Sequence, residues 1–305
     1  MYTKVVSLVL VSVLLFSIVN STTLVEREVD VGDARGSGQR VLSWFGADSN
    51  SATSWPMFHC DAQHTGYTFD EIGFNGQISW IFSATNRIVS SPAISNERVF
   101  VGSDDFSLYA LNATTGKLLW QFLTGSWVRS SPAIVDDRVI FGSCDGYLYE
   151  LNVTDGALIW KLYLGTSVES SPTISDGRIY VGSMNHTLYA LSVFNGSLIW
   201  KQNLNGEIRS SPAVGNNKII AYSNDGNVYG VSAMDGTILW EYFINFTWSS
   251  PSIADGRVFL GSFYNGTFAL DEETGELLWK SSSVYDSGST PRIANGRVYE
   301  GIGEY

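Results

Sequence analysis

The chain has few cysteines and few basic residues. Cys60 and Cys144 are its only cysteines among 305 residues, which excludes a disulfide framework and leaves one bridge between them as a candidate disulfide. The 18 Lys and Arg residues stand against 30 Asp and Glu, so the formal net charge is -12. We therefore expect no nucleic-acid partner and no anionic membrane surface as partner, because binding either relies on basic clusters that neutralise phosphates.

The sequence also lacks the motifs of common active sites. It contains no nucleophile elbow, no glycine-rich phosphate loop and no strong zinc-binding spacing. The segment HCDAQH, from His59 to His64, holds metal-ligand residue types, but its spacing fits none of the usual zinc sites. Asp-Gly pairs such as Asp145-Gly146 are typical of β-turns. The sequence therefore favours a protein without enzymatic activity, with no catalytic residue and no metal ligand.

An apolar run opens the chain. It extends from Val5 to Val19 after Lys4 and is shorter than the about 20 residues of a membrane span. This pattern predicts a signal peptide over residues 1–21, cleaved before Thr22. An uncleaved anchor, which would be the only membrane contact, is the alternative. In both cases we expect an extracellular, periplasmic or cell-surface protein. Residues 22–54 are polar and contain Ser and Gly, so we expect a flexible linker there.

Two residue types recur at a fixed spacing through the rest of the chain. Both series step by 40 residues, with one step of 39. A fixed period in this range is the signature of a repeat architecture. The prolines lie at Pro92, Pro132, Pro172, Pro212, Pro251 and Pro291, and the tryptophans at Trp80, Trp120, Trp160, Trp200, Trp240 and Trp279.

One repeat contains four short strand patterns separated by turns. In residues 130–163 these are SSPAI, RVIFG, YLYEL and ALIWKLY. The proline stands at the first position of a strand, where a missing N–H breaks no ladder bond. Four antiparallel strands in one repeat predict an all-β fold, a β-propeller of four-stranded blades. We expect Ser-Ser-Pro at the crossing between blades and the wide Trp ring wedged between adjacent blades.

The segment ALNATTGKLLW, from Ala110 to Trp120, resembles the tryptophan-docking motif of the PQQ-like β-propeller family. A small residue, a Gly and a Trp keep the same spacing in each copy, and WPMFHCDAQHTGY from Trp55 resembles the segment preceding the first blade. The resemblance covers residues 55–305. It implies a propeller in which five tryptophans dock between blades, namely Trp120, Trp160, Trp200, Trp240 and Trp279.

The family contains both binding proteins and quinoprotein dehydrogenases. The resemblance implies that an enzyme of this family would use pyrroloquinoline quinone (PQQ) with Ca²⁺, beside a vicinal Cys-Cys pair. No such pair exists here, and no insertion breaks the 40-residue period. We therefore expect no cofactor and a binding type similar to the assembly factor BamB, with a protein, peptide or cell-wall glycan as partner. A quinoprotein-like redox protein and a structural surface-layer module are the two alternatives.

Closure of the ring is incomplete in the sequence. Five blades begin near Ser90, Ser130, Ser170, Ser210 and Ser249. A sixth has its first two strands, and residues 76–82 can supply its outermost strand, but its third strand is missing. We expect a propeller over residues 55–305 that is truncated at the C-terminus. Residues 39–44, QRVLSW, are the alternative source of the third strand.

The repeat also predicts a binding face. Links between blades and loops joining the second and third strands of a blade share one face, and the other face carries regular turns. Residues just before each Ser-Ser-Pro vary over this fixed scaffold, as recognition surfaces of repeat proteins do. The alternative is that Arg129 and Glu169 only pair with neighbours around the channel. The predicted binding residues are Trp127, Arg129, Glu169, His186, Arg209, Trp248 and Tyr264.

Six Asn-X-Ser/Thr sequons fall within the propeller. Turns favour Asn for their own geometry, so turn composition is the alternative to modification. All six lie in or near expected loops, where a glycan would be accessible. The candidate glycosylation sites are Asn112, Asn152, Asn185, Asn195, Asn245 and Asn265.

Overall fold

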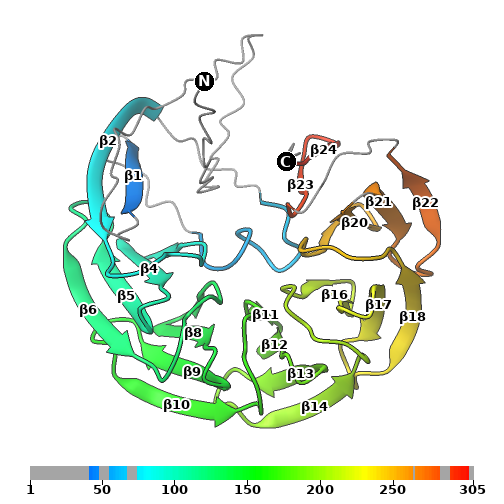
Figure 1. Cartoon of the computed structure of the whole chain (residues 1–305), viewed down its shortest axis with the longest axis horizontal. Helices are drawn as coiled ribbons and strands as arrows, with labels where there is room; N and C mark the ends of the chain where they lie inside the picture. Colours follow the sequence, from blue (N-terminus) through cyan, green and yellow to red (C-terminus); the bar gives the residue numbers. More distant parts are fainter. Residues whose placement is uncertain (1–40, 48–54, 67–73, 264, 282–288, 302–305) are drawn as a thin grey trace, which may run out of the picture.

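The computed structural model describes residues 41–47, 55–66, 74–263, 265–281 and 289–301. The predicted signal peptide lies outside these ranges. The described residues form an all-β molecule whose antiparallel sheets are arranged around a centre like the blades of a propeller (Figure 1). Within these ranges, no helix has the length and apolar character needed to cross a membrane.

Five four-stranded blades follow one another along the chain, and each blade runs from its innermost to its outermost strand. The first is β3 (Ala93–Ser95), β4 (Arg98–Gly102), β5 (Ser107–Asn112) and β6 (Leu118–Leu123); the second is β7 (Ala133–Val135), β8 (Arg138–Gly142), β9 (Tyr147–Asn152) and β10 (Leu158–Tyr163). The third is β11 (Thr173–Ser175), β12 (Arg178–Gly182), β13 (Thr187–Ser192) and β14 (Leu198–Asn203); the fourth is β15 (Ala213–Gly215), β16 (Lys218–Tyr222), β17 (Asn227–Ser232) and β18 (Ile238–Phe243). The fifth is β19 (Ser252–Ala254), β20 (Arg257–Ser262), β21 (Gly266–Asp271) and β22 (Leu277–Lys280).

Two further sheets have two strands each. β1 (Val41–Ala47) pairs with β2 (Phe74–Ser83), and β23 (Arg292–Ala294) pairs with β24 (Arg297–Tyr299). The expected split sixth blade is therefore divided between two sheets, which lie apart in Figure 1. Val41–Ala47, within the predicted linker, forms a strand that pairs with β2, which is distant in sequence. The rest of the predicted linker lies outside the described residues.

β1 occupies the position of a third strand relative to β2. Trp44 pairs with Trp80 and Phe45 with Ile78, with a bulge between them. In the first complete blade, Ala110 pairs with Trp120 and Leu111 with Leu118 across the same bulge. The register of residues 41–47 thus reproduces that of β5, which agrees with the alternative that this part of the chain supplies a third strand.

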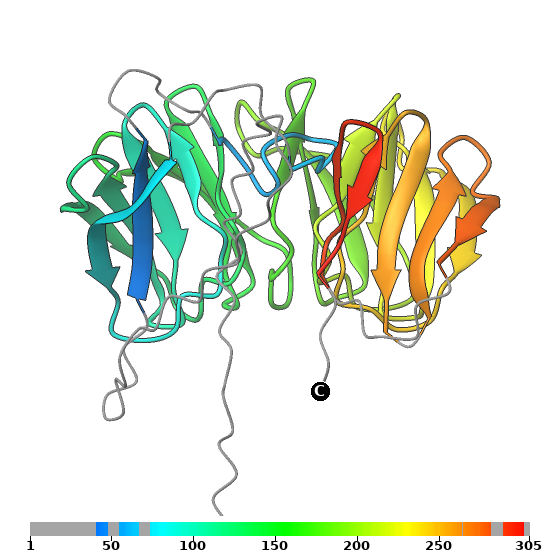
Figure 2. The same ribbon diagram turned by 90° about the horizontal axis from the view of Figure 1, so that it is seen from above.

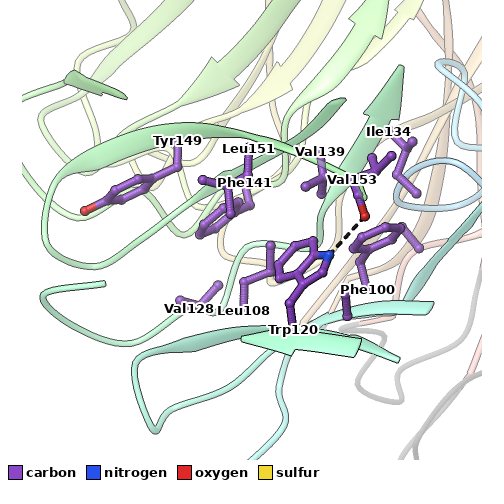
Figure 3. Close-up of a cluster of buried hydrophobic side chains, with 12 residues drawn as sticks. Phe100, Leu108, Trp120, Val128, Ile134, Val139, Phe141, Tyr149, Leu151 and Val153 are labelled. Atoms are coloured by element: carbon purple, nitrogen blue, oxygen red, sulfur yellow. Dashed lines mark hydrogen bonds between the residues drawn. The ribbon is translucent and has the colours of Figure 1, made fainter. Parts of the chain in front are cut away.

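The repeated tryptophans connect each blade to the next. Trp120 Nε1 donates to the carbonyl of Val153 in the following blade at 3.0 Å, among the apolar side chains of both blades (Figure 3). Its ring lies against Gly156, where a Cβ would stand 2.7 Å from the ring and where φ is +72°. Gly is required there both for the close approach and for the left-handed conformation. Equivalent N–H bonds run from Trp80 to Ala113, from Trp200 to Ala233 and from Trp240 to Glu272.

Two predicted docking residues depart from this pattern. Trp160 packs on Gly196, but its buried Nε1 makes no hydrogen bond to the equivalent acceptor of the next blade, Val193 O, to which Arg138 Nη1 donates at 2.8 Å. Trp279 contacts Phe259 of its own blade and remains 41% exposed. No glycine turn of a following blade covers its ring among the described residues, so docking of Trp279 stays a prediction.

Ser-Ser-Pro connects the blades around the centre. The hydroxyl of the first serine accepts a backbone N–H from the end of the second strand of its own blade, as in Ser130 with Gly142 at 3.0 Å. The hydroxyl of the second serine accepts a backbone N–H from the preceding blade. These bonds form a continuous series: Ser91 N to Ser131, Ser131 N to Ser171, Ser171 N to Ser211, Ser211 N to Ser250, and Ser250 N to Thr290.

The segment from Trp55 to Gly66, which we call the hub segment, crosses the centre of the ring (Figures 1 and 2). Its backbone pairs in turn with the innermost strands of the blades, through bonds of Trp55 with Ile94, Pro56 with Ile134, Ala62 with Val214, Gln63 with Ile253 and Thr65 with Ile293. His64 is fully buried; its Nδ1 donates to Pro251 O at 2.9 Å, and its Nε2 lies 3.2 Å from Thr173 Oγ1. Both nitrogens of His64 are thus used for packing.

Candidate binding face

The links between blades and the loops between the second and third strands share one face, which we call the link face. Backbone bonds join the two sets directly: Asp104 N donates to Arg87 O, Cys144 N to Trp127 O, and Asn224 N to Glu207 O, all at 2.8 Å. The opposite face, which we call the turn face, carries the regular hairpin turns. In Figure 2 the turn face points upward, where the red hairpin of β23 and β24 turns, and the hub segment lies closer to it.

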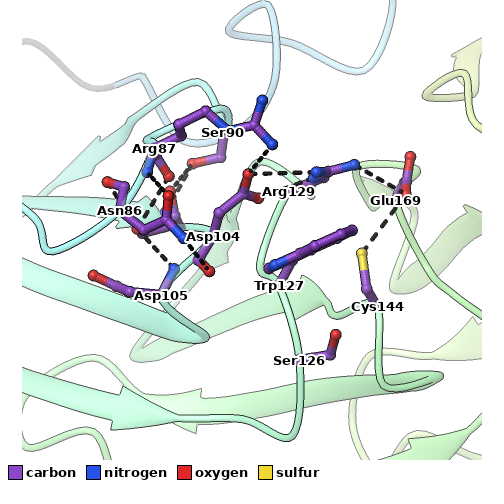
Figure 4. Close-up of polar contacts among 12 residues, drawn as sticks. Asn86, Arg87, Ser90, Asp104, Asp105, Ser126, Trp127, Arg129, Cys144 and Glu169 are labelled. Carbon is purple, nitrogen blue, oxygen red and sulfur yellow. Dashed lines mark hydrogen bonds and ion pairs between the residues drawn. The ribbon is translucent and has the colours of Figure 1, made fainter. Parts of the chain in front are cut away.

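A series of ion pairs crosses the link face. Arg129 Nε and Nη2 donate to both carboxylate oxygens of Asp104, at 2.9 and 3.3 Å, and Nη1 lies 3.6 Å from Glu169 (Figure 4). Arg209 continues it, 3.7 Å from Glu169 and 3.1 Å from Glu207. Arg87 begins it, 2.8 Å from Asp104. This ladder of three arginines and three carboxylates joins residues of four blades, and its formal charges cancel.

The arginine at the middle of the ladder is held on several sides. The Arg129 guanidinium stacks 4.1 Å above the Trp127 ring, and the side chain of Asp104 is only 1% exposed. The hydrogen bonds to Asp104 raise the pKa of Arg129, so its guanidinium remains charged. Two predicted binding residues, Arg129 and Glu169, therefore pair with neighbours, which is the alternative that the sequence left open.

Cys144 belongs to this network. Its thiol lies 3.7 Å from Glu169 Oε1, and burial raises its pKa to about 11. No disulfide joins it to Cys60 among the described residues, so the candidate bridge is not formed in this structure. The physical reason is distance, because Cys60 belongs to the hub segment near the turn face and Cys144 lies on the link face.

The fifth sector of the link face is aromatic. Trp248 occupies the repeat position of Arg129, Glu169 and Arg209, yet it is 66% exposed. Its ring stands edge-on to Phe263 at a centroid distance of 5.0 Å and to Phe246 at 6.0 Å. Phe246 and Phe263 were missed from the sequence, although Phe246 stands two residues before Trp248, as Trp127 does before Arg129. Tyr264, the seventh predicted binding residue, lies outside the described residues.

His186 is not part of the ladder. It sits exposed in the loop between β12 and β13 with φ of +69°. Its backbone accepts from Leu204 N and donates to Ser183 O, and its imidazole makes no hydrogen bond or ion pair with the described residues. The structure therefore assigns His186 a place in a turn and does not bring it into contact with the other predicted residues.

The aspartates of the same loops hold the loops in place. Asp105 accepts from Tyr109 Oη at 2.7 Å, Asp145 from Tyr149 at 2.6 Å and Asp225 from Tyr229 at 2.5 Å. Burial and these carboxylates raise the pKa of Tyr109 and of Tyr229 to about 12. These groups are engaged with each other, so the loops present a rigid surface.

The described carboxylates of the link face do not gather into a Ca²⁺ site. Among the described residues, no three His, Cys, Asp or Glu side chains converge as metal ligands would. The ladder carboxylates of Asp104 and Glu169 are already paired with arginines. A hard cation needs several oxygen ligands in one place, and these residues do not supply them.

Comparisons with known proteins agree with this architecture. A search of curated proteins finds no match. Among solved structures, BamB from Moraxella catarrhalis matches with a TM-score of 0.67 and 20% identity over 75% of this chain and 74% of that one. A quinohemoprotein alcohol dehydrogenase from Pseudomonas putida HK5 (TM-score 0.61, 14% identity) and a europium-containing methanol dehydrogenase (0.64, 12%) also match over 75% of this chain.

These structural neighbours share the fold with this chain at low identity, and the chain spans only 48% and 58% of the two dehydrogenases. The sequence itself decides the family. The family model described as "Outer membrane protein assembly factor BamB" matches residues 71–171, 144–245 and 243–300, which is more than half of the chain. The chain therefore belongs to this family of PQQ-like β-propellers.

Proposed function

We propose that this chain is an exported, non-catalytic scaffold that binds a protein partner on its link face, with Trp248 as the main anchor. The observation that carries the proposal is the exposure of Trp248, 66%, at a position where the second, third and fourth blades place a charged side chain that forms ion pairs within the molecule. Exposed Trp and Arg side chains are the residues most often found as interface anchors. The family description, which names a protein-assembly factor, supports a protein as the partner.

The two kinds of link-face residue have different roles in this proposal. Arg129 already donates two hydrogen bonds to Asp104 and forms an ion pair with Glu169, so it holds the loops in position. Most of the Trp248 ring is open to a partner, and the Phe263 ring stands edge-on to it at a centroid distance of 5.0 Å. Burying such a ring contributes a few kcal/mol to binding. An anchor on a rigid frame also loses little conformational entropy when it binds.

The test compares two equally exposed aromatic residues on opposite faces. Trp248→Ala removes the link-face anchor, and Phe194→Ala removes a side chain that is 72% exposed on the turn face. Each variant and the wild type are immobilised and exposed to envelope proteins of the producing organism, and the captured protein is then titrated. We expect Trp248→Ala to weaken binding about 30-fold or more, the effect of losing an anchor worth about 2 kcal/mol.

Phe194→Ala is expected to bind as the wild type does. The reverse result, normal binding by Trp248→Ala and loss by Phe194→Ala, would place the partner on the turn face and contradict the proposal. A regular array of the protein on the cell surface in electron micrographs, with no other protein captured, would favour the surface-layer alternative.

A further inference from the structure

The fold separates the six sequons into two groups of three. One group lies at hairpin turns between the third and fourth strands of blades, on the turn face. The other group lies on the link face, in or beside the loops between second and third strands or in a link between blades. The turn-face sequons begin at Asn112, Asn152 and Asn195, and the link-face sequons begin at Asn185, Asn245 and Asn265.

The turn-face sequons share one geometry. The Asn Oδ1 accepts the backbone N–H of the sequon's own Ser or Thr, at 3.1 Å in Asn112, 2.8 Å in Asn152 and 3.1 Å in Asn195. The amide nitrogens of these three residues make no hydrogen bond with the described residues. Their hydroxyl partners are all exposed: Thr114, Thr154 and Ser197. Asn195 is exposed and Asn112 and Asn152 are half-buried, so each turn-face sequon combines an exposed hydroxyl with an Asn amide nitrogen that makes no hydrogen bond to the described residues.

Each link-face sequon is blocked in its own way. The Asn185 amide nitrogen donates to Leu164 O at 2.6 Å and to Tyr189 Oη at 2.7 Å. Asn245 is exposed, but its Thr247 is 1% exposed and accepts the Ser249 N–H at 2.9 Å. In the third sequon, Asn265 Nδ2 donates to Ile244 O at 3.4 Å and Oδ1 accepts from Lys280.

We propose that Asn112, Asn152 and Asn195 are acceptors of N-linked glycans and that the three link-face sequons are not modified in the folded protein. This inference rests on the export part of the proposed function, because the sugar donor is a polyprenyl-phosphate-linked oligosaccharide used outside the cytoplasm. A transferase must reach the Asn nitrogen and the Ser or Thr hydroxyl together, which only the turn-face sequons allow.

The transfer is balanced and involves no oxidation. The Asn Nδ2 attacks the anomeric carbon of the donor sugar and forms a C–N bond. The bond between that carbon and the phosphate oxygen breaks, and the phosphate lipid leaves with its electron pair. The amide loses one N–H proton to a base of the transferase. The Oδ1 acceptor role seen in the turn-face sequons can persist, because the carbonyl is unchanged.

This placement has a consequence for the whole molecule. All three acceptors lie on the face opposite Trp248. Glycans there would cover the turn face, including the neighbourhood of the exposed Phe194, which precedes Asn195. The link face would stay open for a protein partner.

The test uses folded full-length protein with a purified oligosaccharyltransferase and a lipid-linked oligosaccharide as the probe. Peptide mapping by mass spectrometry is expected to find the sugar on Asn112, Asn152 and Asn195. The triple variant Asn112→Gln, Asn152→Gln, Asn195→Gln should incorporate at least about tenfold less sugar. The matched control, Asn185→Gln, Asn245→Gln, Asn265→Gln, should incorporate as much as the wild type.

Two results would overturn the inference. One is sugar on the link-face sequons at an occupancy equal to that of the turn-face sequons. The other is incorporation only after the protein has been unfolded in urea. Export is measured separately, by locating the protein in fractions of the producing cells, so a failure of the proposed export and a failure of the acceptor geometry are distinct results.

Discussion

Glu150 stands where Ala110 and Ala190 stand in the neighbouring blades, opposite the tryptophan of its own blade. Its side chain is fully buried, and Arg138 Nη1 lies 3.7 Å away. Burial raises the pKa of Glu150 to about 7, and Arg138 and Trp160 act against that rise. Because a carboxyl group replaces a methyl group here, the stability of the contact between the second and third blades depends on the protonation of Glu150.

This site predicts a pH-dependent difference between the wild type and Glu150→Gln. The folded-state pKa lies above the ordinary 4.5, so the folded protein binds the extra proton between pH 4.5 and about 7. The stability from the neutral form is present below pH 4.5 and is lost as the pH rises through 7. From pH 5 to pH 8, the unfolding free energy of Glu150→Gln relative to that of the wild type should rise by about 1–3 kcal/mol. Urea melts of both proteins at pH 5 and at pH 8 measure this change. A difference between the two proteins that is the same at both pH values would contradict the prediction.

The blade is the element that the tryptophans hold in place, and the joints between blades are not equal. Trp120 has a buried ring, a glycine beneath it and a 3.0 Å bond to the next blade. Trp160 has the glycine but no bond to the next blade, where Val193 O accepts from Arg138 instead. We therefore expect the contact between the second and third blades to be weaker than the contact between the first and second.

Trp120→Ala is expected to lower the unfolding free energy by about 3–5 kcal/mol, because it leaves a cavity between two blades. Trp160→Ala should cost about 1 kcal/mol less, since no hydrogen bond to the next blade is lost there. Urea denaturation of both variants, fitted with a common slope, measures the difference. A larger loss for Trp160→Ala than for Trp120→Ala would show that the bond contributes nothing to docking.

The strands and blade boundaries were predictable because each repeat buries the same apolar positions and ends in the same turns. Strand β1 was expected only as an alternative, from residues 39–44, since its pairing with β2 is non-local and residues 41–47 carry no period. The link face could also be predicted, because connectivity alone decides which loops share a face. Which side chains of the link face pair with one another could not be predicted. Whether Arg129 reaches Asp104 depends on the offset between neighbouring blades, which no spacing in the sequence records.

At the scale of the whole molecule, the ladder and the hub segment connect blades that are distant in sequence. The ladder joins residues of four blades on the link face, and the hub segment bonds innermost strands nearer the turn face. Two separate sets of contacts thus hold the ring, one near each face. We therefore expect substitutions in the ladder and substitutions in the hub segment to change the unfolding free energy in different ways.

Arg129→Ala tests the ladder. Asp104 is almost fully buried and would keep only Arg87, so we expect a loss of about 1–3 kcal/mol of unfolding free energy. Arg209→Ala is the control, because its pairs are more exposed and should contribute under about 1 kcal/mol. Trp248→Ala should leave the urea midpoint unchanged. Equal losses for the two arginine variants would mean that the burial of Asp104 does not matter.

The histidines of the hub segment predict how the molecule responds to acid. Burial lowers the pKa of His64 to about 4, and burial together with the charge of Arg292 lowers that of His59 to about 3. Both values lie below the ordinary 6.5, so the unfolded chain binds more protons than the folded one between pH 6.5 and these values. The stability from the neutral rings is complete above pH 6.5 and is lost as the pH falls through the folded values.

His64→Asn removes one of these titrations, and its amide N–H can still donate toward Pro251 O, the partner of His64 Nδ1. The variant should be less stable than the wild type at pH 7, because it loses buried ring contacts. Its unfolding free energy should nevertheless fall less steeply with acid between pH 6 and pH 4.5, by up to about 1.4 kcal/mol per pH unit, the value for one proton. His186→Asn, at an exposed histidine of the link face, is the control for losing a histidine. Urea melts at half-unit pH steps give the slopes. If His64→Asn keeps the wild-type slope, His64 is not held neutral by burial, and the acid response of the ring must arise from groups outside the hub segment.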